Sequence, residues 1–178
     1  MESPDDLQTV AEIVQGLDQL GLRPVLVGGM ALVILGSRRV THDYDFIVTN
    51  PGRLLAQTIE LFYDSGLELV SRLNDEGQVV STIDNRKIAA IRLRLDAPAS
   101  AYFYSVDTRL RVDLFFDFPF AAVALAEHAN QMKIRGKTFS IAADEDLLKL
   151  KEIARAGRSK PGDAEDIAFL EARLKRRT

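Results

Sequence analysis

The spacing of apolar and polar residues along the chain separates helix-like from strand-like segments. Apolar residues recur every three or four positions in the predicted helices, whereas the predicted strands are short apolar or alternating runs bounded by turn residues. The pattern predicts helices over residues 3–20, 30–35, 50–65, 119–128, 144–156 and 163–175. It predicts strands over residues 24–27, 41–48, 67–70, 79–83, 88–95, 102–106, 110–117, 132–134 and 138–141.

The order of these elements predicts the class of fold. Helices and strands alternate at the start of the chain, several strands follow, and the chain ends in helices. This order is typical of a mixed-sheet α/β or α+β domain. We expect residues 1–142 to form the main domain and residues 143–178 to form a C-terminal helical pair packed on it as one compact unit.

The composition narrows the functional classes. The chain has 178 residues, of which 47% are hydrophobic and 28% charged, which is typical of a globular domain with a sizeable core. A net charge of −3 argues against a protein that mainly coats nucleic acid, although a local basic patch remains compatible with it. There is no cysteine, hence no disulfide or thiolate site. The acidic N-terminus does not resemble a signal peptide, no apolar run is long enough to span a membrane, and we expect a cytoplasmic protein.

The most informative motif is a pair of carboxylates one residue apart. Asp43 and Asp45 open the apolar strand 41–48, and side chains two positions apart in a strand point to the same face. Two carboxylates on one face repel each other unless a positive charge lies between them. Because Mg²⁺ prefers carboxylate oxygens, the pair predicts a divalent metal site, Mg²⁺ or Mn²⁺.

Two further features surround this pair. Gly28-Gly29 connects a buried strand to a helix, so it is either a phosphate-binding loop or simply a tight turn. Asp113 lies within the apolar strand 110–117 and needs a partner there. That partner is either a metal shared with Asp43 and Asp45 or an arginine, for which the candidates are Arg92, Arg94 and Arg111. Asp117, at the end of the same strand, is expected to cap a neighbouring backbone segment.

Taken together, Gly28-Gly29, the motif Arg39-Val40-Thr41-His42-Asp43-Tyr44-Asp45 and the later strand residue Asp113 resemble the nucleotidyltransferase superfamily with the DNA polymerase β-like palm. The version of the motif is similar to that of small prokaryotic members, including abortive-infection type toxins. The resemblance implies that Asp43, Asp45 and Asp113 are the catalytic and metal-binding residues. It further implies that Gly28, Gly29, Arg39 and Thr41 contribute to nucleotide binding.

The C-terminal segment extends this resemblance. The run from Asp146 to Lys151, then Arg158, and then Lys160 to Ile167 is similar to the tail of the same branch. By that resemblance Lys151 holds nucleotide phosphates, and Asp163 and Asp166 support the site. Lys149 and Lys151 diverge on a helix, so only one of them reaches the site. From its position alone, Asp163 is equally suited to cap the last helix, with Asp166 at its third position.

The resemblance implies a Mg²⁺-dependent enzyme that transfers a nucleoside monophosphate from a nucleoside triphosphate, such as ATP, to an acceptor hydroxyl. The acceptor would be a tRNA end, a protein side chain or a small molecule. The branch also suggests a toxin of a toxin–antitoxin pair, with a cognate antitoxin as partner. Two alternatives stay open: a non-catalytic nucleotide-binding or regulatory module with the same fold, and an α/β protein whose carboxylates are merely paired with arginines.

Overall fold

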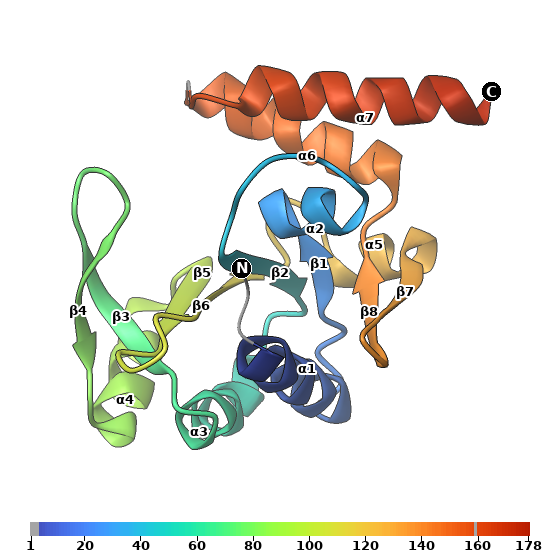
Figure 1. The fold of residues 1–178 in the computed structure, drawn as a ribbon. Helices are drawn as coiled ribbons and strands as arrows, with labels where there is room; N and C mark the ends of the chain where they lie inside the picture. Colours follow the sequence, from blue (N-terminus) through green and yellow to red (C-terminus); the bar gives the residue numbers. More distant parts are fainter. Residues whose placement is uncertain (1–3, 159) are drawn as a thin grey trace.

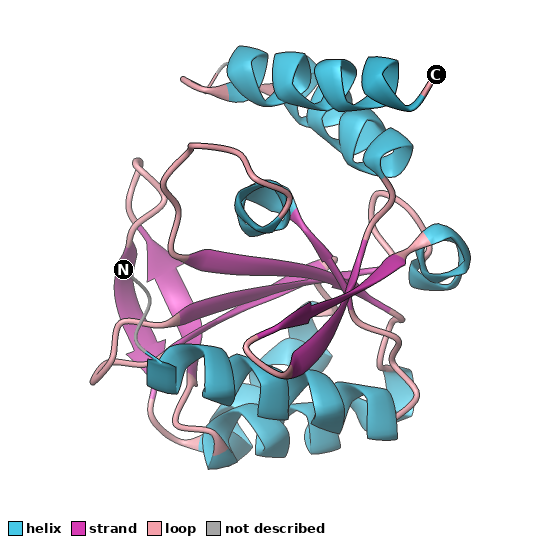
Figure 2. Ribbon diagram, turned by 45° about the vertical axis from the view of Figure 1, so that its right-hand side comes forward, coloured by secondary structure: helices cyan, strands magenta, loops and turns pink. Residues whose placement is uncertain are grey.

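The computed structural model describes residues 4–158 and 160–178, which form one mixed sheet with helices on both faces (Figures 1 and 2). The predicted helix start at Ser3 lies outside the described residues. The helices are α1 (Pro4–Gln19), α2 (Gly28–Ile34), the short 3-10 helix η1 (Gly52–Leu54), α3 (Leu55–Asp64), α4 (Arg86–Asp96), α5 (Ala122–His128), α6 (Asp144–Gly157) and α7 (Asp163–Arg177). The strands are β1 (Val25–Val27), β2 (Asp43–Val48), β3 (Glu68–Leu73), β4 (Val79–Ile83), β5 (Ser100–Tyr104), β6 (Arg111–Phe116), β7 (Asn130–Ile134) and β8 (Lys137–Ile141).

The eight strands lie in the order β4-β3-β5-β6-β2-β1-β8-β7. The pairs β2–β6 and β1–β8 are parallel, and the other neighbouring strands are antiparallel. The predicted mixed-sheet α/β class is therefore confirmed. The two acidic strands, β2 and β6, are direct neighbours in the middle of this sheet.

Alternate residues of β2 and β6 point to opposite faces of the sheet, one facing the core and the other carrying the carboxylates. Tyr44, Phe46, Val112 and Leu114 are at most 1% exposed. This apolar side belongs to the same core as α1 and α3 (Figure 2). The opposite face carries the carboxylates, and α2 and the antiparallel pair α6–α7 lie beyond it (Figure 1). Burial of the apolar face thus fixes the register that presents the acidic residues on the other face.

One predicted element is wrong: residues 88–95 form most of helix α4 rather than a strand. The Asn85 side chain accepts hydrogen bonds from the backbone amides of Lys87 and Ile88, which caps the helix start. Ala89 and Leu93, four residues apart, are the buried residues of this helix. The apolar pattern of this stretch is compatible with a strand or a helix, because most of its large apolar residues are exposed. The Asn85 cap is the feature that favours the helix.

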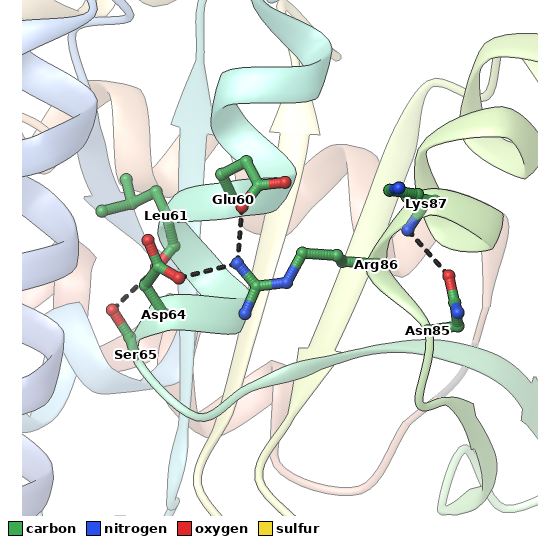
Figure 3. Close-up of polar contacts among 7 residues, drawn as sticks. All are labelled: Glu60, Leu61, Asp64, Ser65, Asn85, Arg86 and Lys87. Atoms are coloured by element: carbon green, nitrogen blue, oxygen red, sulfur yellow. Dashed lines mark hydrogen bonds and ion pairs between the residues drawn. The ribbon is translucent and has the colours of Figure 1, made fainter.

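Helix α4 is tied to α3 by a surface ion-pair cluster (Figure 3). Arg86 Nη1 lies 2.5 Å from Glu60 Oε2 and 2.7 Å from Asp64 Oδ1, and its guanidinium lies over the Tyr63 ring. All three charged side chains are exposed, so we assign the cluster a positional rather than a strongly stabilising role. Among the described residues no helix combines the length and apolar character needed to cross a membrane.

Candidate active site

The three predicted carboxylates lie on two adjacent strands at matching positions. In the parallel β2–β6 pair, Asp45 is aligned with Asp113 and Asp43 with Arg111. Aligned residues of neighbouring strands share a face, so the three carboxylates and Arg111 lie together. Within the described residues, the carboxylates of Asp43 and Asp45 make no hydrogen bond or ion pair, although both residues are part of the hydrogen-bonded sheet. The structure therefore brings together the acidic residues that the sequence singled out.

Arg111 is the partner of Asp113. Arg111 Nε donates to Asp113 Oδ1 at 2.8 Å, and Nη2 donates to Oδ2 at 3.0 Å. The remaining Nη1 donates to the carbonyl oxygen of Gly77, in the turn between β3 and β4, at 2.7 Å. Of the three arginines considered from the sequence, the structure thus selects the one two positions away on the same strand. It also shows a contact with Gly77 that no sequence signal indicated.

Burial and mutual repulsion change the acidity of these groups. Burial raises the pKa of Asp45 to about 7, with further upward contributions from the charges of Asp113 and Asp43. The charges of Arg111 and Lys151 act in the opposite direction on this pKa. Burial also raises the pKa of Asp113 to about 6, although its hydrogen bonds to Arg111 oppose that rise. A site with excess negative charge and raised pKa values has the character expected of a cation-binding centre.

Gly28 lies directly against Asp45. Its φ of +69° is in the left-handed region, and a Cβ added there would be 2.2 Å from Asp45 Oδ2. A Cβ on Gly29 would be 2.8 Å from the Arg39 guanidinium carbon. The glycine pair is therefore required by the turn and by the close approach of the Asp45 and Arg39 side chains.

We expect Gly28→Ala to destabilise the protein by about 2 kcal/mol or more, because it adds a clash with Asp45 to the cost of a left-handed alanine. The matched control is Gly136→Ala, whose φ is +81° but whose added Cβ would meet nothing within 4 Å. It should show the backbone cost alone, about 1 kcal/mol. Urea unfolding measures both, and equal losses would mean that the clash with Asp45 is absent in solution.

A basic cluster from distant parts of the chain lies next to the glycine turn. Arg39, in the loop between α2 and β2, and Lys151 on α6 both pair with Asp166 on α7. The Lys151 Nζ–Asp166 Oδ2 distance is 2.8 Å, and Asp166 is 3% exposed. Lys149 is exposed, so Lys151 is the lysine of this helix that points inward. The positive charge of Lys151 lowers the pKa of Asp45, so we infer that this lysine lies within electrostatic range of the carboxylates.

The remaining predicted residues occupy supporting positions. Asp163 is not the cap of α7 and Asp166 is not its third residue, because the cap is Gly162 in a left-handed conformation. Instead, the buried Asp163 lies 3.9 Å from Lys151 Nζ. Thr41 lies in the loop just before β2. Asp117 accepts hydrogen bonds from the amides of Asn50 and Ala122, which confirms its predicted capping role.

The donor set matches a hard divalent cation in its chemistry but is not yet arranged for one. Among the described residues, no three acidic or histidine side chains are grouped closely enough to hold a metal ion together. We attribute this to Arg111, which occupies both oxygens of Asp113. Asp43 and Asp45 fit the first cation, since they are unpaired, oxygen-bearing and mutually repulsive. Asp113 fits a second one only after Arg111 has moved.

We therefore expect Arg111→Gln to bind Mn²⁺ more tightly than the wild type, by about tenfold without nucleotide, because Asp113 is released and a nearby positive charge is lost. Electron paramagnetic resonance of free Mn²⁺ at pH 8 measures this affinity. Arg111→Lys, which keeps the charge but not the two-pronged contact, separates the two causes. Arg94→Gln, which removes an exposed arginine, is the control. Unchanged affinity in Arg111→Gln would show that Arg111 does not compete with metal.

Comparison with known proteins supports the same fold. No family model matches the chain, and no curated protein matches it in sequence. Among solved structures, it is similar to an antigenic nucleotidyltransferase-like protein from Paracoccidioides brasiliensis, with a TM-score of 0.57 and 18% identity over 94% of this chain and 76% of that one. It is also similar to the lincomycin-bound lincosamide antibiotic adenylyltransferase LnuA, with a TM-score of 0.57 and 11% identity over 95% and 96% of the two chains.

A third similar structure is the antibiotic-resistance factor ANT(2″)-Ia, with a TM-score of 0.55 and 13% identity over 96% of this chain and 85% of that one. At these identities the likeness concerns the fold. The predicted nucleotidyltransferase fold is therefore confirmed. The roles of the individual site residues stay predictions.

Proposed function

We propose that this protein is a Mg²⁺-dependent nucleotidyltransferase that moves a nucleoside monophosphate from a nucleoside triphosphate to an acceptor hydroxyl. The observation that carries the proposal is the alignment of Asp45 with Asp113 beside Asp43, on a fold shared with adenylyltransferases. The acidic and basic clusters meet at one glycine turn, so they offer a place for a metal-bound triphosphate. ATP is the first nucleotide to test, since LnuA is named as an adenylyltransferase.

We assign metal binding to the three carboxylates and phosphate binding to the glycine turn. Asp43 and Asp45 would hold a Mg²⁺ ion that also binds the triphosphate, and Asp113 would join them around a second. The bound ions would neutralise phosphate charge and lower the pKa of the attacking hydroxyl. The backbone amides of Gly28 and Gly29 would bind the leaving phosphates, with Thr41 in the loop before β2.

Arg39 and Lys151 supply the positive charge opposite these carboxylates. Both are anchored by Asp166, so they are held in place before the triphosphate arrives. In the reaction, the acceptor oxygen forms a bond to the α-phosphorus, and the bond from that phosphorus to the β-phosphate oxygen breaks. Pyrophosphate leaves, and the hydroxyl proton passes to a carboxylate of the cluster. Positioned cations of this kind act mainly by stabilising charge that develops on the phosphates.

Incubation with each α-labelled nucleoside triphosphate, Mg²⁺ and either total RNA, a protein extract or lincomycin tests the proposal. Label should move to one acceptor class with wild type and not with Asp43→Asn/Asp45→Asn. The matched control, Asp84→Asn/Asp96→Asn, removes two exposed carboxylates at the two ends of α4, which packs on α3, and should keep activity. If the double variant at the site binds Mg²⁺–ATP as tightly as wild type, the assigned metal site is wrong.

One observation favours a second candidate, a non-catalytic nucleotide-binding or regulatory module. The two-pronged Arg111–Asp113 contact satisfies the third carboxylate without any metal. A module of this kind would bind Mg²⁺–ATP and transfer no label to any acceptor. A toxin role, an antitoxin partner and a tRNA acceptor follow from the sequence resemblance alone and stay predictions.

A further inference from the structure

A groove lined by arginines lies between the loop that follows α2 and the last helix. Its volume is about 400 Å³. Its lining residues are Leu35, Gly36, Phe169, Arg173, Arg176 and Arg177. It is distinct from the carboxylate centre, because none of the residues assigned to metal or triphosphate lines it. It therefore calls for an explanation other than the triphosphate site.

Two of the three arginines of this groove pair with a buried carboxylate. Asp144, at the first position of α6, is 0% exposed. Its Oδ2 accepts a hydrogen bond from Arg173 Nε at 3.1 Å and lies 3.4 Å from Arg177 Nη1. Arg173 Nη1 also donates to the carbonyl oxygen of Leu35 at 3.2 Å, which joins α7 to the opposite wall. Arg173 and Arg177 are thus anchored on one carboxylate, and Arg176 is exposed on the same helix.

The charge of the groove is in excess. Three guanidinium groups line the groove beside one carboxylate, and Arg176 Nε donates to the backbone carbonyl of Ala172 in its own helix. Guanidinium groups match the paired oxygens of phosphate, and the excess charge makes an anion the complementary ligand. Phe169, whose ring lies 5.9 Å from the Arg173 guanidinium carbon, adds an aromatic wall. An anion attached to an organic group therefore fits better than a bare ion.

The position of the groove relates it to the proposed reaction. Asp166, which anchors the triphosphate-binding cations, lies seven residues before Arg173 on α7, about 10 Å along the helix. The loop that starts at Leu35 and Gly36 leads to Arg39, which lies against Gly29 and pairs with Asp166. A ligand in the groove is thus close to the reacting centre but outside the space of the triphosphate.

We propose that this groove binds a phosphate ester of the acceptor substrate, so that the acceptor hydroxyl is presented to the carboxylate centre from this side. The inference rests on the proposed transferase function, which it deepens by naming the acceptor class. Two sources share this chemistry: the backbone of a polynucleotide and a phosphorylated small molecule.

The test is a binding measurement that needs no turnover. A labelled 12-nucleotide single-stranded RNA and, separately, ribose 5-phosphate are titrated against the wild type and Arg176→Gln/Arg177→Gln. Arg173 stays in place, so Asp144 keeps its main partner and the fold is preserved. The matched control is Arg53→Gln/Arg94→Gln, which removes two exposed arginines elsewhere. Both variants lose the same charge.

We expect the groove variant to bind the probe at least tenfold more weakly than the wild type, with Mg²⁺–ATP affinity unchanged. If only RNA binding is weakened in the groove variant, the acceptor is a polynucleotide. The slope of log affinity against log salt should then be smaller in this variant than in the wild type by about two. If the groove variant also binds ribose 5-phosphate more weakly, the acceptor is a small phosphate ester. Equal losses in the groove and control variants, or no loss in either, overturn the proposal. Asp43→Asn/Asp45→Asn should keep probe binding, so a failure of the transferase assignment is seen separately.

Discussion

Asp45→Asn is expected to lower nucleotidyl transfer by at least about a thousandfold and, at the same time, to make the metal-free protein more stable at pH 8. The loss of rate follows from removing a central oxygen donor of the proposed metal centre. The gain in stability follows from the unfavourable burial of this carboxylate. Both effects come from the buried negative charge of Asp45, which a cation would neutralise and which Asn lacks.

The direction of the pH dependence can be worked out from the pKa of Asp45. Its pKa in the folded protein is about 7, above the 3.8 of an unperturbed carboxyl. Between these values the folded state binds the proton more tightly, so stability falls as the pH rises from about 4 to about 7 and then levels off. The rise of the pKa corresponds to on the order of 4 kcal/mol, lost fully above pH 7.

Urea unfolding in EDTA at pH 4.5, 6 and 8 measures this effect. We expect Asp45→Asn to match wild type at the lowest pH and to exceed it by about 2 to 4 kcal/mol at the highest. Mg²⁺ should restore stability to the wild type and not to the variant. Asp75→Asn, at an exposed turn position, is the control and should follow the wild type at each pH. A variant that is no more stable than wild type at pH 8 would show that Asp45 is not a strained carboxylate.

The second large effect is expected at Asp166, where replacement by Ala should cost about 3 kcal/mol of stability and weaken ATP binding. Asp166 is buried and pairs with Arg39 and Lys151, and the Lys151 side chain is itself only 12% exposed. Removing the carboxylate leaves a poorly solvated ammonium group with Asp163, at 3.9 Å, as its remaining partner. The two cations then lose the positions in which they would meet the triphosphate.

A double-mutant cycle isolates this contact. Lys151→Met and Asp166→Ala are made singly and together, and unfolding free energies and Mg²⁺–ATP affinities are measured. We expect the double variant to be more stable than the sum of the single losses predicts, by at least about 1 kcal/mol. Glu165→Ala, at an exposed position in the same turn of α7, controls for helix propensity. Additive losses would mean that Lys151 and Asp166 do not act as a pair.

The sequence could predict the carboxylate centre because strand geometry is strict. Side chains two apart share a face, and the apolar residues between them specify which face is buried, so Asp43 and Asp45 could be placed on one face before the structure was known. The position of Asp113 beside them was expected from the resemblance to nucleotidyltransferases. The arginine partner of Asp113 could only be narrowed to three candidates from the sequence. The pairing of Arg111 with Asp113 depends on the β2–β6 register and on the Gly77 turn, and these features involve residues far apart in sequence.

The two incorrect predictions concern how helices begin, at α4 and at α7. Helix α4 carries few buried residues, so its apolar pattern was weak and the Asn85 cap was the informative signal. At α7, Gly162 rather than Asp163 precedes the helix, and this released Asp163 to face Lys151. The groove at Asp144 could not be foreseen, because its two walls come from residues 35 and 173, and no local pattern links them.

The contact between Arg39 and Asp166 joins residues 127 positions apart. Contacts of such long sequence separation carry a large loop-closure entropy and tend to form late in folding. During synthesis, the palm strands with their three carboxylates leave the ribosome well before α7 does. The nascent chain therefore holds an acidic centre whose cationic counterpart is not yet anchored, and competence to bind a triphosphate should appear as one of the last events of folding.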